Sequence, residues 1–338
     1  MDTTTALATA LTTESNPKSR QKSINNNNNS DQKIPVVMKH QPLEPLAIVW
    51  RNVFLFAALH IGALIGLYQG VFMAQWKTLA FAWFCHVIGG IGITAGVHRL
   101  WSHRSYKANF PLRLMLVVFQ TMALQNDVIE WSRDHRGHHK WSDTDADPHN
   151  SNRGFFFSHM GWLLCRKHAA VKEKGQTLDL SDLYADPLLR FQRRYYKPLA
   201  ILACFVMPTL IPYLLWNESV MVAFYVDLLR YTLTLHCTWM VNSVAHRFGN
   251  RPYDRDIEPR QSVTTAVMAF GEGWHNYHHT FPYDYKTAET PYTLNTTTMF
   301  IDFFATIGWA TDRKTVSAEA IRSTRQRKGD GEHTMAEY

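Results

Sequence analysis

The most regular feature of the sequence is a set of long apolar stretches separated by polar segments. The first carries no Asp, Glu, Lys or Arg between Arg51 and Lys77. At about 1.5 Å rise per residue, a helix of that length crosses a hydrocarbon core of about 30 Å. The same reasoning predicts four membrane-spanning helices, over about 52–73, 78–97, 199–216 and 220–241.

Two of the stretches contain residues that helices in lipid tolerate only with help from neighbours. Pro208 and Pro212 interrupt the third stretch, which is acceptable where neighbouring helices satisfy the freed backbone groups. Asp227 and Arg230 lie in the fourth, three residues apart and therefore on nearly the same helix face. We expect them to form a structural ion pair that offsets the cost of charge in lipid.

The polar segments indicate the orientation and the domain limits. An even number of spans puts both chain ends and the segments 98–198 and 242–338 on one side, and the positive-inside rule places these Lys- and Arg-rich segments in the cytosol. Residues 1–42, rich in Thr, Ser, Lys and Asn, are expected to be a disordered tail. The predicted fold is an all-α integral membrane domain over 43–310, in which the four membrane-spanning helices carry a cytosolic helical cap, followed by a basic C-terminal tail over 311–338.

The overall charge limits the kinds of partner. A formal net charge of +7 suits a protein that works at an anionic membrane face or receives a polyanionic substrate. Nucleic acid is the weaker interpretation of the same charge. The N-terminal segment lacks the basic start, continuous apolar core and small-residue cleavage site of a signal peptide, so the first span is expected to direct membrane insertion.

Histidine carries the chemistry that the sequence predicts. Of the 17 histidines, nine fall into four clusters just outside the spans, on the expected cytosolic side: HRLWSH, HRGHHK, NSVAH and HNYHH. The candidate metal ligands in these clusters are His98, His103, His135, His138, His139, Asn242, His246, His275, His278 and His279. His60 and His86 lie inside spans and are interpreted as packed polar residues.

Helix geometry divides the clustered histidines into two sets. At about 3.6 residues per turn, positions i and i+4 lie about 40° apart, so His135 and His139 can bind one ion. His138 points about 100° away from His139 and is expected to serve a second ion. The box HNYHH repeats this arrangement at its first, fourth and fifth positions. Two such boxes facing each other therefore predict two adjacent metals.

The other two clusters lie where spans are expected to end. His98 and His103 are five residues apart, about 140° around a helix, so they reach one ion only if the helix ends or bends between them. Asn242 and His246 are again i and i+4, with Trp239 about one turn earlier. The fourth span is therefore expected to connect the membrane to the metal site.

Ligand number, more than ligand type, points to the metal. Imidazole suits Zn, Cu, Fe and Ni. Nine histidines exceed the needs of one tetrahedral zinc, there is no HExxH motif, and the ExxH pairs of soluble di-iron bundles are absent from these boxes. A pair of redox-active iron ions is therefore the predicted cofactor.

An acidic run follows the second box. Asp143, Asp145 and Asp147 are spaced as in a calcium loop, but Pro148 stands where an EF-hand requires Gly and Gly154 stands where it requires Glu. The expected role of these carboxylates is to orient the histidines.

Together the motifs resemble those of a known family. HRLWSH, EWSRDHRGHHKW, NSVAH and GEGWHNYHH look like the histidine boxes of animal membrane acyl-CoA desaturases of the stearoyl-CoA delta-9 type, in order and spacing, over about residues 43–310. The resemblance implies that one iron is held by His98, His103, His135, His139 and His278. It implies that the other is held by His138, His246, His275 and His279, with Asn242 reaching it through water.

The resemblance also implies a reaction and partners. A saturated fatty acyl-CoA would receive a cis double bond, at delta-9, from O2 and electrons of cytochrome b5 with its NADH-dependent reductase, at the endoplasmic reticulum membrane. The implied acyl-CoA contacts are Asn126, Arg133, Asp134, Arg166, Lys167 and Trp239. The basic residues among them suit the phosphates of CoA, which arginine can bind through two nitrogens. No HPGG haem motif or nicotinamide fingerprint occurs, so electrons are expected from a separate protein.

Three other functions would use some of the same features. A fatty-acid hydroxylase of the wider histidine-box group would share the metals but insert oxygen. A membrane zinc hydrolase would be redox-silent, and a non-catalytic lipid sensor would keep the spans without needing nine ordered ligands. Box spacing and the Arg and Lys anchors favour desaturation.

Overall fold

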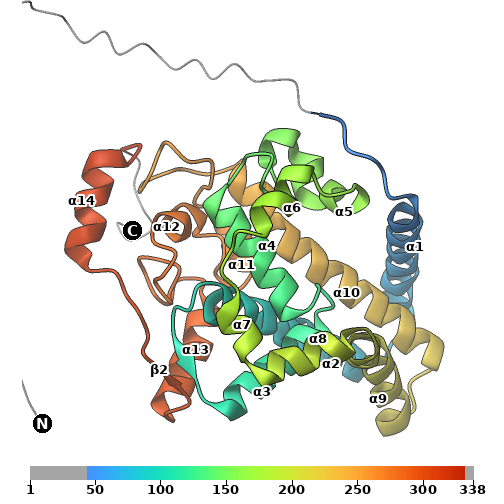
Figure 1. Ribbon diagram of the computed structural model, residues 1–338. Coiled ribbons are helices and arrows are strands. Elements are labelled where there is room, and N and C mark those ends of the chain that lie inside the picture. The colour runs from blue at the N-terminus through green and yellow to red at the C-terminus, as the bar shows by residue number, and fades with distance from the viewer. Residues whose placement is uncertain (1–43, 332–338) are drawn as a thin grey trace, which may run out of the picture. The chain divides into compact units, whose positions relative to one another are not determined.

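The apolar stretches form four long helices in a computed structural model that describes residues 44–331 (Figure 1). The expected disordered tail over 1–42 lies outside the described residues. Four spans are confirmed as helices long and apolar enough to cross a membrane, and they run over Trp50–Phe72, Trp76–Ser102, Pro187–Trp216 and Val220–His246. The protein is therefore an all-α membrane protein.

Three of the spans are composite. The first is the single helix α1 (Trp50–Phe72). The second joins α2 (Trp76–Ile91) to the π-helix η1 (Gly92–Ser102), the third joins α8 (Pro187–Ile201), the π-helix η4 (Leu202–Val206) and α9 (Met207–Trp216), and the fourth joins α10 (Val220–Ser243) to the short 3₁₀ helix η5 (Val244–His246). The second and fourth spans continue past their predicted C-terminal limits, because these helices run on through polar residues that the cap buries. Arg99 in η1, for example, is 0% exposed.

The first and fourth spans pack closely against each other. At Gly66 of α1, an added Cβ would lie 2.0 Å from the backbone oxygen of Tyr225 in α10. Only glycine allows the two backbones to approach this closely, as is usual where helices associate in lipid. This contact fixes α10, whose far end carries part of the histidine cluster.

Glu218 joins the two tight connections at the end of the spans that lies away from the cap. Its carboxylate accepts hydrogen bonds from the Gln75 backbone N–H at 2.9 Å and from the Thr78 hydroxyl at 2.6 Å. Gln75 and Thr78 belong to the start of the second span, whereas Glu218 lies between the third and fourth. One buried side chain thus links both helical hairpins.

The cap is built from short helices and one small sheet. The strands β1 (Lys107–Ala108) and β2 (Ala310–Thr311) pair antiparallel. The remaining elements are α3 (Phe110–Met122), α4 (Val128–Lys140), η2 (Ser151–Arg153), η3 (Phe157–Gly161), α5 (Trp162–Leu164), α6 (Ala169–Gly175), α7 (Ser181–Ala185), α11 (Val263–Met268), α12 (His275–Thr280), α13 (Thr296–Thr306) and α14 (Ala318–Lys328). Figure 1 shows α4 and α12 side by side with the cap end of α10. These elements surround the histidine cluster.

Part of the predicted C-terminal tail packs on the cap. Residues 311–331 are described, and they contain the end of β2 and the helix α14. Ile321 of α14 is buried in an apolar cluster with Tyr277 and Phe281, which belong to or directly follow α12. Because α12 carries the last histidine box, α14 supports the part of the cap that holds this box.

The predicted ion pair in the fourth span is confirmed. Arg230 Nε donates to Asp227 Oδ1 at 3.0 Å, and Arg230 Nη2 donates to the Cys204 backbone oxygen at 2.6 Å. Both charged side chains are 3% exposed. The pair therefore links the fourth span to the third at mid-helix.

Removal of one member of this pair should be costly. Asp227→Ala leaves the Arg230 guanidinium buried without its counter-charge and should lower the free energy of unfolding by about 3 kcal/mol. The double variant Asp227→Leu/Arg230→Met should recover most of this loss, because no unpaired charge remains. Unfolding of the detergent-solubilised protein measures both. Equal stabilities of the single and double variants would contradict a pair that matters through its charge.

Candidate metal centre and substrate cavity

The four histidine clusters converge where the second and fourth spans enter the cap. Each cluster lies in or directly after a helix that meets the others at this point. The contributing elements are η1 with the residue that caps it, α4, η5 and α12. Asp127 begins α4 by accepting hydrogen bonds from the backbone N–H groups of Ile129 and Glu130 at 3.0 and 3.1 Å, which sets the direction of the second box.

The π-helical turn of η1 explains how His98 and His103 reach the same place. In this turn the His103 N–H donates to the His98 oxygen at 3.1 Å, five residues back. The wider turn brings residue i+5 over residue i, and the two rings lie 4.8 Å apart. The bend that was expected between His98 and His103 is thus a change from α-helical to π-helical geometry.

One set of five rings surrounds a common point. Each of His98, His103, His135, His139 and His278 offers one ring nitrogen, and these atoms all lie within 4.8 Å of one another. His98 Nε2 lies 2.9 Å from His278 Nε2, and His103 Nε2 lies 2.8 Å from His135 Nε2. His139 Nε2 lies 3.0 Å from His278 Nε2.

A second set of four rings lies beside the first. His138, His246, His275 and His279 again bring one nitrogen each within 4.8 Å of the others. His275 Nε2 lies 3.1 Å from both His246 Nε2 and His279 Nε2. The sets touch where the rings of His139 and His279 stack at 4.0 Å. The structure thus brings the nine histidines together in two groups; that these groups hold metal ions stays a prediction.

Carboxylates contact the Nδ1 atoms of three clustered histidines, and the Nε2 atoms of these rings face the cluster. Asp147 Oδ2 accepts from His138 Nδ1 at 2.9 Å, and Asp143 Oδ2 lies 3.2 Å from His246 Nδ1. With the proton held on Nδ1, each ring must present the lone pair of Nε2 to the cluster. Two of the three aspartates of the acidic run therefore lie where an orienting role requires them.

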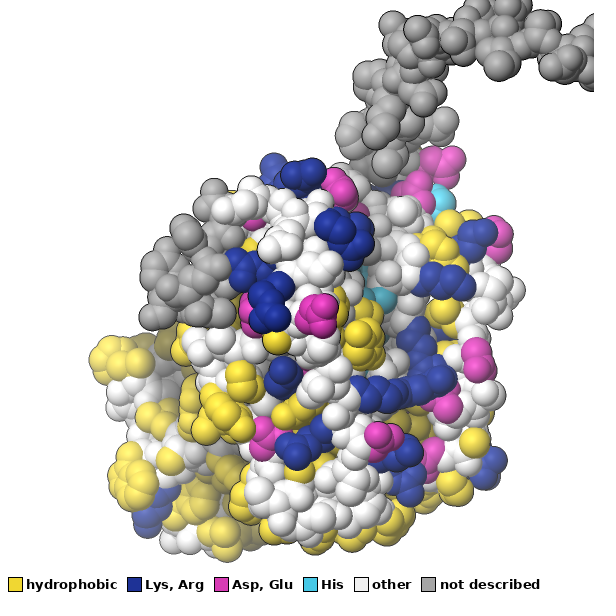
Figure 2. All heavy atoms as spheres, turned by 90° about the vertical axis from the view of Figure 1, so that its left-hand side faces the viewer, with side chains coloured by type: hydrophobic (Ala, Val, Ile, Leu, Met, Phe, Trp, Pro, Cys, Tyr) yellow, Lys and Arg dark blue, Asp and Glu magenta, His cyan; other side chains and the backbone are white. Residues whose placement is uncertain are grey.

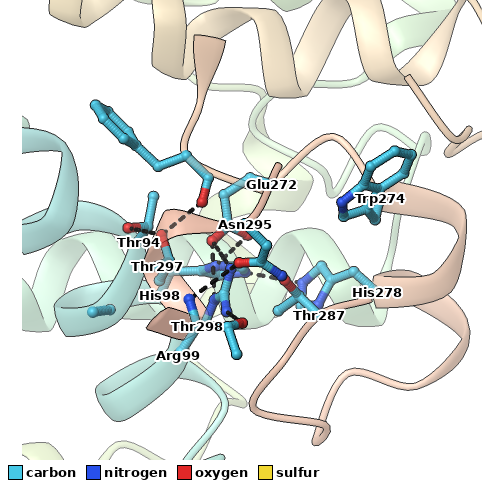
Figure 3. Close-up of polar contacts among 12 residues, drawn as sticks. Thr94, His98, Arg99, Glu272, Trp274, His278, Thr287, Asn295, Thr297 and Thr298 are labelled. Atoms are coloured by element: carbon cyan, nitrogen blue, oxygen red, sulfur yellow. Dashed lines mark hydrogen bonds and ion pairs between the residues drawn. The ribbon is translucent and has the colours of Figure 1, made fainter. Parts of the chain in front are cut away.

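Glu272 contacts the Nδ1 atom of a histidine in the first set. The sequence alone did not identify Glu272 as a functional residue. Its Oε2 lies 3.0 Å from His98 Nδ1, and its Oε1 accepts from Arg99 Nη2 at 2.8 Å (Figure 3). Arg99, next to a ligand, is fully buried and also donates to Asn295, Thr298 and the backbone oxygens of Tyr285 and Lys286. The sequence feature that could have identified Glu272 is its place in GEGWHNYHH, three positions before His275.

Electrostatics favours neutral ligands over most of the cluster. Burial, together with neighbouring imidazoles, holds the pKa values of six rings well below their ordinary value: His103, His135, His139, His275, His278 and His279. Burial also disfavours the charged form of His138, but the Asp147 carboxylate outweighs it and raises the pKa of His138. Neutral imidazole is the form that binds metal.

The arrangement fits metal ions better than it fits an empty hydrogen-bond network. Glu272 Oε2 lies 3.0 Å from His98 Nδ1, a position that favours a proton on Nδ1 and an Nε2 lone pair facing His278 at 2.9 Å. The Nε2 atom of His138 is buried with no hydrogen-bond partner among the described residues. Two nitrogens bound at about 2.1 Å and at right angles lie about 3.0 Å apart, which matches the observed spacings.

An apolar cavity leads from the histidines into the spans. In the cap, beside the histidine sets, it is lined by His98, His135, His138, Glu272 and His275. Farther along the spans, it is lined by His86, Tyr231 and Thr234. His86 Nδ1 lies 2.8 Å from the Thr234 hydroxyl oxygen, so His86 is a packed polar residue, as expected, and also lines the cavity. His86 precedes His98 by twelve residues of one continuous span, so the cavity extends along the second span.

Five of the six predicted substrate contacts line this cavity or the groove beside it. Asn126, Asp134 and Trp239 line the cavity, as does Asn242. The groove is lined by Arg133, Asp134 and Lys167 together with Lys172 and Glu130. Asp134 borders both spaces and pairs with Arg133 at 2.8 Å and with Lys167. Arg166 is exposed and lines neither space.

Comparison with known proteins relates this architecture to a family. A model of the fatty acid desaturase family matches residues 74–288. The chain is 58% identical over 277 residues to a delta(9)-fatty-acid desaturase of Caenorhabditis elegans, covering 82% of each chain. It is 57% identical over 295 residues to an acyl-CoA desaturase of Ovis aries, covering 86% of this chain and 81% of the relative. It is 54% identical over 298 residues to a stearoyl-CoA desaturase of Homo sapiens, covering 87% and 82%.

The acidic run offers a matched test of ligand orientation. Asp147→Asn removes the charge that holds the His138 proton and should weaken metal binding about 10- to 100-fold. Asp145→Asn is the control, because Asp145 pairs with Arg153 at 2.6 Å instead of with a histidine. Metal content after dialysis against graded chelator measures both. Equal metal retention by the two variants would contradict the orienting role of Asp147.

Proposed function

The chain belongs to the fatty acid desaturase family, and we propose from this premise that it places a cis double bond, at delta-9, in a saturated fatty acyl-CoA. The observation that carries the proposal is the cavity that begins at the paired histidine sets and runs into the spans. A straight apolar chain lying in it passes directly beside the ligands. The curated relatives carry the names of acyl-CoA, stearoyl-CoA and delta(9) desaturases.

The proposed cofactor is two iron ions. His98, His103, His135, His139 and His278 would hold one, and the other would be held by His138, His246, His275 and His279, with Asn242 near it through water. When bound, the irons supply the activation of O2 that breaks unactivated C–H bonds. The protein contributes neutral, pre-oriented imidazoles and a site from which bulk water is largely excluded.

The acyl-CoA is proposed to bind in two parts. Arg133, Lys167 and Lys172 in the groove meet the phosphates of the CoA headgroup, and Arg166 remains a proposed contact on the adjoining surface. The acyl chain enters past Asp134 and lies against Trp131 and Trp239. Moving the chain by one methylene changes its burial by only about 0.8 kcal/mol, so the anchored headgroup and the closed far end must set the position of the double bond.

The proposed setting is the endoplasmic reticulum membrane, with both termini and the cap in the cytosol. The bias of Lys and Arg toward the cap supports this orientation. Electrons are proposed to come from cytochrome b5 and its NADH-dependent reductase, because the sequence contains no haem or nicotinamide motif of its own.

Expression in desaturase-deficient yeast tests the reaction. The wild-type chain should restore growth and yield monounsaturated fatty acids, and mass spectrometry of their derivatives reads the double-bond position and chain length. His139→Ala should abolish the product, because it removes a ligand from the first set. His168→Ala is a matched control, since its ring lies near Glu44 and outside both histidine sets. A hydroxylated product, or full activity of His139→Ala, would contradict the proposal.

The far end of the cavity should control chain length. His86→Ala opens space beyond the ring that closes the cavity and should shift the preference toward longer acyl-CoA substrates, by about fourfold for each added methylene that becomes buried. Competition between palmitoyl-CoA and stearoyl-CoA in microsomes measures the ratio. The control is His60→Ala, a histidine in α1 that does not line the cavity. An unchanged ratio in His86→Ala would place the end of the acyl chain elsewhere.

A further inference from the structure

The turn between α3 and α4 has a backbone conformation that residues other than glycine rarely adopt. Leu124 has a φ of 47° and Asn126 a φ of 70°. Positive φ is uncommon outside glycine, especially for a bulky side chain such as leucine, and it persists only where the surrounding structure holds it. Leu124, Gln125 and Asn126 all line the cavity. This strained turn is therefore part of the wall along which the proposed acyl chain lies.

Two glutamine side chains hold both ends of the turn. Gln120 Nε2 donates to the Asn126 backbone oxygen at 2.6 Å, and the Val128 backbone N–H donates to Gln192 Oε1 at 3.0 Å. The two side chains are also joined, because Gln192 Nε2 donates to Gln120 Oε1 at 2.5 Å. We call Gln120 and Gln192 the glutamine clamp. It connects α3, which contains Gln120, to the start of the third span, where Gln192 lies in α8.

Only one orientation of the two amides satisfies these hydrogen bonds. A backbone N–H can only donate, so Val128 requires the side-chain oxygen of Gln192 to face it. The Gln192 nitrogen then faces Gln120, whose oxygen accepts and whose nitrogen is left to donate to the Asn126 oxygen. Reversal of either amide would bring donor against donor. The glutamine clamp therefore holds the turn in one geometry.

Burial leaves the glutamine clamp without alternative partners. Polar side chains on the surface, such as the Lys and Arg side chains that Figure 2 shows over one face of the molecule, can bind water when a protein partner is lost. Gln120 and Gln192 are 0% and 1% exposed, so water does not replace either amide. Loss of one amide therefore leaves polar groups of the other unpaired and releases one end of the turn.

The fourth span also contacts the turn. The Tyr231 hydroxyl donates to the Leu124 backbone oxygen at 3.2 Å, and Gln125 Nε2 donates to the Thr238 hydroxyl at 3.0 Å. Tyr231 and Thr238 line the cavity themselves, whereas the two residues of the glutamine clamp do not. The clamp can therefore act on a bound acyl chain only through the turn.

The geometry of the turn matters because burial distinguishes neighbouring methylenes only weakly, by about fourfold. The wall between the headgroup groove and the far end of the cavity must then keep the acyl chain on one course. Building on the proposed function, we propose that Gln120 and Gln192 are positioning residues for the reaction. By holding Leu124 and Asn126 at positive φ, they set which pair of methylenes lies beside the histidine sets.

Replacement of either glutamine by methionine tests this role, because methionine keeps the length of the side chain and removes the amide. Gln192→Met and Gln120→Met should each raise the fraction of product with a displaced double bond about fourfold, since the released turn admits neighbouring positions of the acyl chain. Mass spectrometry of derivatised products formed from stearoyl-CoA in yeast microsomes measures this fraction. Metal content should equal wild type, because neither residue belongs to the histidine sets.

The double variant tests whether the two amides act together. Loss of either amide already breaks the bridge between Asn126 and Val128. Gln120→Met/Gln192→Met should therefore displace the double bond no more often than the single variants do.

Backbone hydrogen exchange gives a readout that does not depend on the reaction. In metal-free protein in nanodiscs, peptides over 123–128 should exchange at least about fivefold faster in Gln192→Met than in wild type, because the Val128 N–H loses its acceptor. Gln69→Met is the matched control. It makes the same change at a half-buried position of α1 that does not line the cavity, and should match wild type in both measurements.

An unchanged isomer fraction in both single variants would overturn the proposal, and so would a double variant in which the two single effects multiply. Loss of product together with metal, at an unchanged isomer fraction, would overturn it too, because the glutamine clamp would then only stabilise the centre. Absence of any unsaturated product from wild type would refute the proposed reaction itself, a result that is visible before any variant is made.

Discussion

Nine imidazole rings converge in this protein with ring nitrogens that face one another at about 3 Å, and the cap is organised around the need to hold them there. Buried acceptors that face each other lose water without gaining a hydrogen bond, which is unfavourable unless a cation lies between them. Asp143, Asp147 and Glu272 strengthen this demand by keeping the proton on the outer nitrogen of their partners. The convergence of these rings therefore supports the proposed binding of metal ions between them.

The same helices that deliver the ligands also shape the substrate space. The second span carries His86 at one end of the cavity and His98 at the other, and the fourth carries Thr234, Trp239 and, at its end, His246. The second and fourth spans consequently position both the clustered histidines and the walls of the cavity. The His86–Thr234 contact joins the second span to the fourth, and the Asp227–Arg230 pair and the Gly66 contact join the fourth span to the third and the first. A ruler for acyl chains needs that rigidity, because burial of a methylene discriminates weakly.

The positive charge of the chain serves different purposes in different places. Arg99 and Arg230 are buried and bind internal acceptors, so they contribute to structure. Arg133 and Lys167 border a groove that suits a phosphate-bearing headgroup. Lys140 and Lys314 are exposed on the surface of the cap. The basic residues of this chain of net charge +7 are thus divided among internal pairs, the proposed substrate groove and the exposed surface of the cap.

The sequence by itself determined the spans, the four histidine clusters and, from the angles of i and i+4 on a helix, which histidines of HRGHHK share a set. These features are local, since they depend on apolar length and on spacing within one helix. Only the tertiary structure decided the π-helical turn that brings His103 over His98, the contacts of Glu272 and Arg99 beside the first histidine set, and the contact between His86 and Thr234. Each of these depends on segments more than a hundred residues apart, or on a change of helix type that no local pattern of apolar residues encodes. Burial of polar residues at span ends likewise depends on the cap that folds over them, which is why the helices continue beyond their apolar limits.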